Sequence, residues 1–203
     1  LNDSTPEEMV ETISLSIPNK FILAIGGDHA TTIGTVKGLE KYHEEFSVIQ
    51  FDAHADFRDS WNNSSLNHAC VAKQVSKNRE VALLGIRSMD IDEKTQIENN
   101  ENVYLLNAYN FNLTKLKELL PKLKDKVYIS IDVDIFDPSF IRNTGTPEPG
   151  GFNWNQVIAI LKTIFKEKEV IGADIVEFAP KENFQAEAYS LAKLVYKIMA
   201  MRP

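Results

Sequence analysis

The stretch Val127-Tyr128-Ile129-Ser130-Ile131-Asp132-Val133-Asp134 decides the fold of this 203-residue chain. Its first part is almost continuously apolar, whereas a strand with one wet face would alternate between apolar and polar residues. Five further short apolar runs lie at residues 21–25, 48–51, 81–86, 103–106 and 170–176. Segments with the apolar spacing of a helix separate them, most clearly at residues 157–165 and 188–199. The sequence therefore predicts one α/β domain over residues 1–203, with a mostly parallel central sheet covered by helices on both faces.

Acidic and histidine side chains follow three of these predicted strands. Gly26-Gly27-Asp28-His29 comes after the first run, Asp52-Ala53-His54-Ala55-Asp56 follows the second, and Asp132 and Asp134 end the stretch quoted above. Sheets of this class bind ligands beyond the carboxyl ends of their strands, and alternate residues of an extended segment share a face. We therefore expect six side chains to converge, namely His29, Asp52, His54, Asp56, Asp132 and Asp134.

Four of these six side chains are carboxylates, which cannot all stay ionised a few ångströms apart in a medium of low dielectric constant. Taken singly, each residue also fits an ordinary role in a turn, a helix cap or a solvated loop. Their joint presence at three strand ends instead favours a metal centre, because divalent cations remove the repulsion. Oxygen-rich ligation with two imidazoles and no cysteine suits Mn²⁺ better than structural Zn²⁺. Two ions that share bridging carboxylates can hold a hydroxide at neutral pH.

The order of several motifs resembles that of the ureohydrolases, the family of arginase and agmatinase. The motifs are Gly-Gly-Asp-His at 26–29, Asp-Ala-His-Ala-Asp at 52–56, Ser-Ile-Asp-Val-Asp-Ile-Phe-Asp-Pro at 130–138, Thr-Gly-Thr-Pro at 144–147 and Val-Glu-Phe-Ala-Pro at 176–180. The resemblance implies an arginase-like three-layer αβα fold, two Mn²⁺ ions per subunit and a homo-oligomer, either a trimer or a hexamer. It assigns His29, Asp52, Asp56 and Asp132 to one ion, and Asp52, His54, Asp132 and Asp134 to the other.

The resemblance also implies an activity, which is hydrolysis of a guanidino compound by the metal-bridging hydroxide. A guanidinium is a poor electrophile because its charge is delocalised and its pKa is above about 12. Glu177, at the end of the last predicted strand, is expected to bind and orient it, although a single carboxylate also fits a structural role. His68 stands where the family places a proton-shuttling histidine, and it also fits a helix start without chemistry.

The substrate is less closely specified by the sequence. We expect Arg58, Thr144 and Glu177 to contact it, and we place agmatine first, with putrescine and urea as products. Arg58 departs from arginase: it can meet a substrate carboxylate, as in a formiminoglutamate or guanidino-acid hydrolase, or it can pair with Asp59 and be inert. Arginine comes third. An inactive metal-binding module is the alternative of another class, because the N-terminal part that the family leads us to expect before the first strand is largely missing.

Charge and composition limit the partners. A net charge of -7 argues against binding to nucleic acid or to an anionic membrane, both of which need a basic surface, and favours a small cationic substrate. The single cysteine, Cys70, fits a reducing cytoplasm. No apolar run approaches the length of about 18 to 20 residues that a membrane span needs. We therefore expect a cytoplasmic protein.

Overall fold

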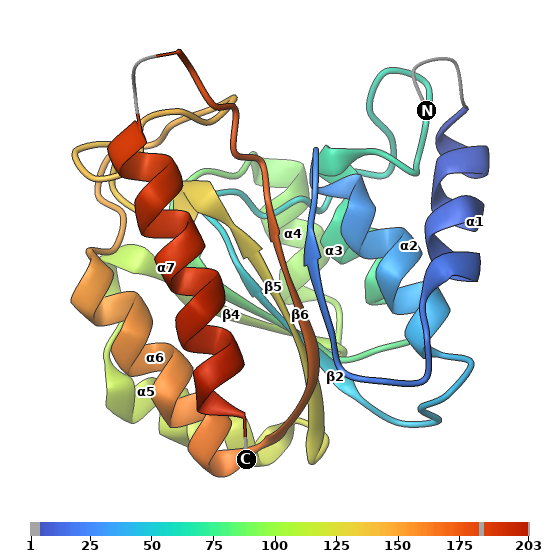
Figure 1. Ribbon diagram of the computed structural model, residues 1–203. Coiled ribbons are helices and arrows are strands. Elements are labelled where there is room, and N and C mark those ends of the chain that lie inside the picture. The colour runs from blue at the N-terminus through green and yellow to red at the C-terminus, as the bar shows by residue number, and fades with distance from the viewer. Residues whose placement is uncertain (1–4, 183–184, 203) are drawn as a thin grey trace.

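Six parallel strands form one sheet in the computed structural model, which describes residues 5–182 and 185–202 (Figure 1). The strands are β1 Ile22–Ile25, β2 Ser47–Phe51, β3 Val81–Ile86, β4 Val103–Asn107, β5 Lys126–Asp132 and β6 Glu169–Val176. Their order across the sheet is β1-β6-β5-β2-β3-β4. Each of the six predicted strands is found, with its ends within one residue of the prediction, so the predicted fold class is confirmed.

Helices cover both faces of this sheet. They are α1 Pro6–Ser16, α2 Ala30–Leu39, α3 Val71–Val75, α4 Ile91–Glu98, α5 Leu113–Leu119, α6 Trp154–Glu167 and α7 Gln185–Met201, with short 3₁₀ turns at His68–Cys70, Ala108–Asn110, Leu120–Lys122 and Val133–Ile135. Helices α5, α6 and α7 pack on one face, and α1 to α4 lie on the other (Figure 1). The architecture is therefore the three-layer αβα arrangement that the sequence predicts.

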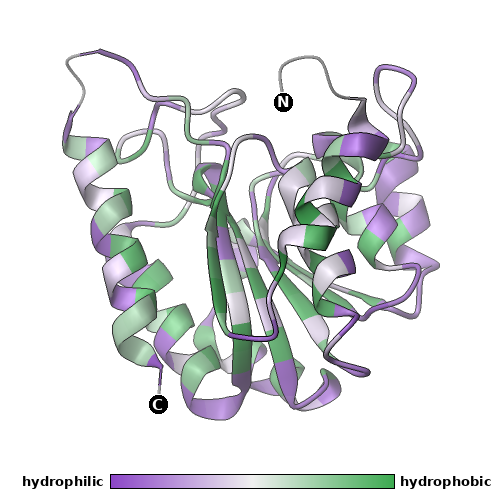
Figure 2. Ribbon diagram, turned by 45° about the vertical axis from the view of Figure 1, so that its right-hand side comes forward, coloured by the Kyte–Doolittle hydropathy of each residue, from purple (hydrophilic) through white to green (hydrophobic). Residues whose placement is uncertain are grey.

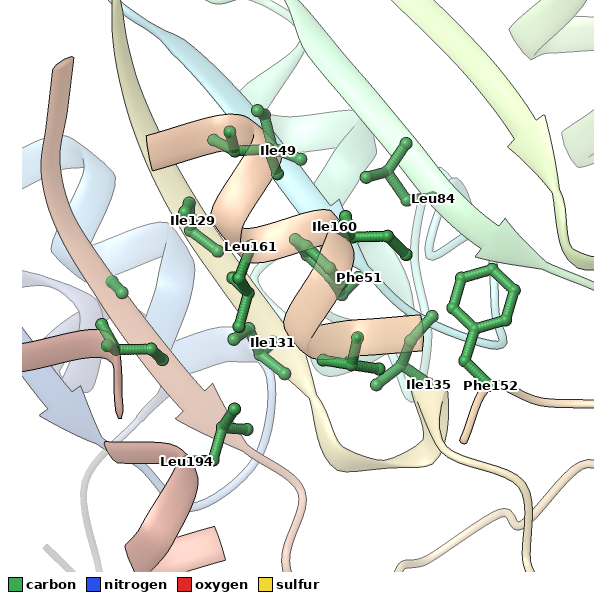
Figure 3. Packing of buried hydrophobic residues seen from close by; sticks show 14 of the residues in the cluster. Ile49, Phe51, Leu84, Ile129, Ile131, Ile135, Phe152, Ile160, Leu161 and Leu194 are labelled. Carbon is green, nitrogen blue, oxygen red and sulfur yellow. The ribbon is translucent and has the colours of Figure 1, made fainter. Parts of the chain in front are cut away.

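The strands are hydrophobic throughout because both of their faces are buried. Ile129 and Ile131 of β5 point to one face, where they pack with Leu161 of α6 (Figure 3), while Tyr128, directly before Ile129, belongs to the core on the opposite face. Figure 2 shows the result, with mostly hydrophobic strands in the centre and helices that carry both hydrophobic and hydrophilic residues. No helix in residues 5–182 or 185–202 is long and apolar enough to cross a membrane.

A long loop between β5 and α6 is held together by one carboxylate. The Asp137 side chain accepts hydrogen bonds from the main-chain N–H groups of Ser139 (2.9 Å), Gly150 (2.9 Å) and Gly151 (3.2 Å). Main-chain bonds on either side, from Asp137 N–H to Phe152 O (3.0 Å) and from Phe152 N–H to the residue 135 carbonyl (2.9 Å), close the loop at its base. This loop continues from the strand end that carries Asp132 and Asp134, so its path shapes the edge of the sheet where ligands are expected.

Replacing Asp137 by Asn is predicted to destabilise the protein in a pH-dependent way. Hydrogen bonds from Ser139 are the largest cause that lowers the pKa of the Asp137 carboxyl to about 2. Because this pKa lies below the unfolded value, the carboxylate stabilises the fold at neutral pH and the contribution is lost as the pH falls from about 4 through about 2. Thermal unfolding should show a Tm roughly 2–4 °C below the wild type at pH 7.

The difference in Tm between Asp137→Asn and the wild type should shrink as the pH approaches 3. Glu101→Gln is the control, since Glu101 is an exposed acid in the turn before β4. A deficit of Asp137→Asn that stays constant between pH 7 and pH 3 would contradict this role for the ionised carboxylate.

Candidate metal centre and adjoining pocket

The six predicted ligands lie together at the carboxyl edge of the sheet. His29 precedes α2, after β1; Asp52 follows β2, and Asp132 ends β5. Their side chains are almost fully buried, as are Asp134 and Asp56, whereas His54 is half-buried. Because β1, β6, β5 and β2 are neighbours in the sheet, segments more than a hundred residues apart in the sequence meet at one point.

Two His and Asp clusters share the carboxylate of Asp52. In the first, His29 Nδ1 lies 3.1 Å from Asp52 Oδ2 and 3.5 Å from Asp132 Oδ2. In the second, His54 Nδ1 lies 2.8 Å from Asp134 Oδ2 and 3.7 Å from Asp52 Oδ1. The two oxygens of Asp52 thus face different histidines, and each cluster offers three ligand atoms close enough to hold one metal ion.

The remaining predicted ligand joins the first cluster. Asp56 Oδ2 is 2.9 Å from His29 Nδ1, and Asp56 adopts a φ of 49°, in the left-handed region that L residues seldom occupy. Glu177, with a φ of 65°, shares this conformation. Strained backbone of this kind persists where the surrounding structure enforces it and concentrates at functional sites.

His29 fits a metal ion better than it fits the partners it has. Its Nδ1 atom is buried and makes no hydrogen bond in the described structure, although three carboxylate oxygens surround it. The other ring nitrogen, Nε2, lies 2.9 Å from Ser130 Oγ. If Nε2 carries the proton and donates it to Ser130, the lone pair of Nδ1 points toward the carboxylates, which is the arrangement of a metal-binding imidazole.

A buried carboxylate anchors this arrangement from behind. Asp174 of β6 accepts hydrogen bonds from Ser130 Oγ (2.8 Å), Thr32 Oγ1 (2.7 Å) and the hydroxyl of Tyr128 (2.7 Å). In addition, Gln50 donates to Asp52 Oδ2 (2.8 Å). Gln50, Ser130 and Asp174 are not among the site residues predicted from the sequence. The sequence feature that could have revealed them is that each is a polar residue inside a strand expected to be buried on both faces, where a polar side chain needs a hydrogen-bond partner.

The charges of the site are poorly balanced by protein groups alone. Burial, and then the charge of neighbouring carboxylates, raises the pKa of Asp132 and of Asp134, and raises that of Asp56 to about 7. Burial opposes protonation of His54, but Asp134 and Asp52 raise its pKa to about 10. Each shift reduces the net negative charge of the cluster, as bound cations would. The residues present therefore fit divalent metal.

A pocket of about 550 Å³ opens over the clusters. Its lining includes four of the predicted ligands, His29, His54, Asp56 and Asp132, and both predicted catalytic residues, His68 and Glu177. Glu177 Oε1 accepts a hydrogen bond from the main-chain N–H of His29 (2.7 Å), and burial raises the pKa of the Glu177 carboxyl. The carboxylate is thus held at a fixed place beside the first cluster.

Arg58 and Thr144, two of the predicted substrate contacts, differ in their position relative to the pocket. Arg58 lines the pocket, but its Nη2 is 3.0 Å from Asp90 Oδ2 and its guanidinium lies 4.7 Å from the ring centre of Trp61. The interpretation that Arg58 pairs with Asp59 is therefore wrong, since the Asp59 carboxylate lies 3.3 Å from Lys73 Nζ. The pocket lining includes Gly145 and Thr146 rather than Thr144, so contact between Thr144 and a substrate stays a prediction.

Known proteins resemble this chain in sequence over most of its length. The model of the arginase family matches residues 3–201. An N(1)-aminopropylagmatine ureohydrolase from Synechocystis is 39% identical over 184 residues, which cover 89% of this chain and 60% of the relative. An agmatinase from Pyrococcus horikoshii is 34% identical over 195 residues, which cover 96% of this chain and 67% of the relative. The chain thus spans about 60% of the first relative's length.

The fold agrees with the sequence comparison. The crystal structure of an agmatine ureohydrolase of Thermoplasma volcanium superposes with a TM-score of 0.85 at 27% identity and covers 98% of this chain and 69% of that one. With the family model matching almost the whole chain, and with this fold, we conclude that the protein belongs to the arginase family.

Proposed function

We propose that the protein hydrolyses the guanidinium group of an amine, with agmatine as the first candidate and urea and putrescine as products. The observation that carries this proposal is the pair of His and Asp clusters that share Asp52 beneath a pocket with Glu177 in its wall. Mn²⁺ is the metal that we propose, because the ligand set is oxygen-rich with two imidazoles. A bound pair of divalent ions supplies a nucleophile from water at neutral pH.

The protein's own residues would bind and orient the substrate. Glu177 offers a carboxylate to the guanidinium, and its main-chain N–H bond to Gly27 O (2.8 Å) and its side-chain bond to His29 N–H fix its position. A guanidinium held in one orientation exposes its central carbon to attack from the side of the clusters. His68, in the same wall, would deliver a proton to the leaving amine.

The charge of the pocket wall favours an amine over a carboxylate at the far end of the substrate. Among the described residues, Arg58 is the one lysine or arginine in the wall, and Asp90 already faces its guanidinium. Asp90 and Glu93 are the acidic residues of the lining that lie outside the proposed metal ligands and Glu177. A substrate carboxylate would have to displace Asp90 and approach these acids, whereas an ammonium group would be attracted. This supports agmatine over formiminoglutamate, guanidino acids and arginine.

N(1)-aminopropylagmatine is the second candidate. The relative from Synechocystis carries that substrate in its name, and a pocket of about 550 Å³ leaves room beyond the guanidinium for a longer amine. Both candidates have the same reacting group, so they share the roles proposed for Glu177 and His68.

Substrate profiling tests this function. With Mn²⁺ added to metal-free protein, urea release should be measured from agmatine, N(1)-aminopropylagmatine, 4-guanidinobutyrate and arginine. We expect one of the two amines to have a kcat/KM at least about tenfold above that of either carboxylate, equivalent to roughly 1.4 kcal/mol. Turnover of none of the four would contradict the proposed activity and leave a metal-binding module, and a preference for 4-guanidinobutyrate would contradict the charge argument.

Glu177→Gln tests the binding of the cation. The amide keeps an oxygen that can accept from His29 N–H but loses the charge, so kcat/KM for the better amine should fall about 30-fold or more, equivalent to roughly 2 kcal/mol. Asp59→Asn is the matched control, because Asp59 is an exposed carboxylate outside the pocket lining. Equal kcat/KM values for Glu177→Gln and the wild type, with metal content unchanged, would rule out the proposed role.

A further inference from the structure

Arg87, directly after β3, joins three segments of the site without being a predicted ligand. Its side chain donates to five main-chain carbonyl oxygens, those of Gly85 (3.2 Å), Asp134 (2.6 Å), Phe136 (3.4 Å), Glu148 (2.9 Å) and Pro149 (3.1 Å). Two of these carbonyls lie in the segment that carries the ligand Asp134, and two lie in the loop that follows the pocket residues Gly145 and Thr146. One guanidinium therefore ties the metal centre to the pocket wall.

The main chain of Arg87 continues the same connection. Its N–H donates to the carbonyl of Ala53 (2.9 Å), which lies between the predicted ligands Asp52 and His54. The N–H of Ala53 in turn donates to Asp134 Oδ1 (2.9 Å). Arg87 thus contacts both sides of the second cluster, formed by Asp52, His54 and Asp134.

The loop is shaped around the guanidinium. A Cβ atom added to Gly151 would lie 2.7 Å from Arg87 Nη2 and 2.5 Å from the main-chain nitrogen of Asp137, so the guanidinium and the adjoining main chain would have to shift if another residue stood here. Arg87 makes no ion pair within 4.0 Å in the part of the chain that the structure describes. What it contributes is the planar array of donors, which a lysine ammonium cannot reproduce.

We propose that Arg87 is a positioning residue for the second metal ion and for the adjoining pocket wall. It fixes the main chain of Asp134 relative to Ala53, and so sets the separation between the Asp134 and His54 side chains. His29 and Asp56 belong to the first cluster and have no hydrogen bond to Arg87, so the first ion should depend on it far less. This inference rests on the proposed function, because it assumes that both clusters bind metal.

Arg87→Lys separates the donor array from the charge, since it keeps the charge and loses the array. Metal-free protein should be titrated with Mn²⁺ by calorimetry and equilibrium dialysis, which report both the number of ions bound and their affinities. We expect the wild type to bind two ions. In the variant, one ion should bind about 10–100-fold more weakly, as when groups that orient metal ligands are removed. The affinity of the other should fall clearly less, although the two sites share Asp52 and are therefore coupled.

Arg79→Lys is the matched control. Arg79 also joins separate segments, through Glu40 Oε1 (3.0 Å) and the carbonyl of Glu44 (2.6 Å), and it lies over the ring of Phe46 away from the clusters. Its replacement can lower Tm but should leave both metal affinities unchanged. Gly151→Ala is a second test, because its Cβ would crowd Arg87 Nη2 and the main chain of Phe136 and Asp137 while every predicted ligand is kept, and it should weaken the same ion.

The outcomes distinguish the inference from the function on which it rests. If the wild type binds two ions and turns over an amine, but Arg87→Lys and Gly151→Ala bind both ions as tightly, the inference is overturned and the function stands. Equal weakening of both ions would also overturn it, since that is the effect of a general loss of stability. If the wild type binds no metal, both the inference and the proposed function fail.

Discussion

Four buried carboxylates lie within a few ångströms of one another at the carboxyl edge of the sheet, and their repulsion is the constraint on which the rest of the structure depends. Two imidazoles cannot balance them, and the raised pKa values of Asp132 and Asp134 express the cost of that imbalance. Such a cluster is stable only if a group of opposite charge offsets the free-energy cost of burying the carboxylates together. Divalent metal meets this need with the ligand atoms already in place.

The fold supplies these atoms through its strand order rather than through local sequence. Asp52 and Asp132 end neighbouring parallel strands, β2 and β5, and the helix after β1 brings His29 to the same edge. The layer behind them is just as ordered: Asp174 holds Ser130, which lies against His29, and Arg87 holds the main chain of Asp134. Such supporting groups fix the direction of each ligand, which is what a pair of closely spaced ions requires.

The parts of the structure that follow from periodicity were predictable from the sequence. A strand buried on both faces has a distinctive pattern, so the six strands, and the convergence of the acidic and histidine side chains that follow them, could be predicted from the residues alone. The partner of Arg58 was not predictable, because the choice between Asp59 and Asp90 depends on how two loops pass each other. For the same reason the sequence could not show that Gly145 and Thr146, and not Thr144, line the pocket. The bonds from Arg87 to main-chain carbonyls were also not predictable, because they depend on the path of the loop and not on the spacing of residue types.

The most direct measurement of the central claim is a crystal structure of the Mn²⁺-loaded protein with anomalous diffraction data. The proposed centre predicts two anomalous peaks about 3.5–4 Å apart, as in two-metal hydrolytic sites. One peak should lie against His29 and Asp56 and the other against His54 and Asp134, with one oxygen of Asp52 directed to each. A single peak, or two peaks that Asp52 does not touch, would contradict the account.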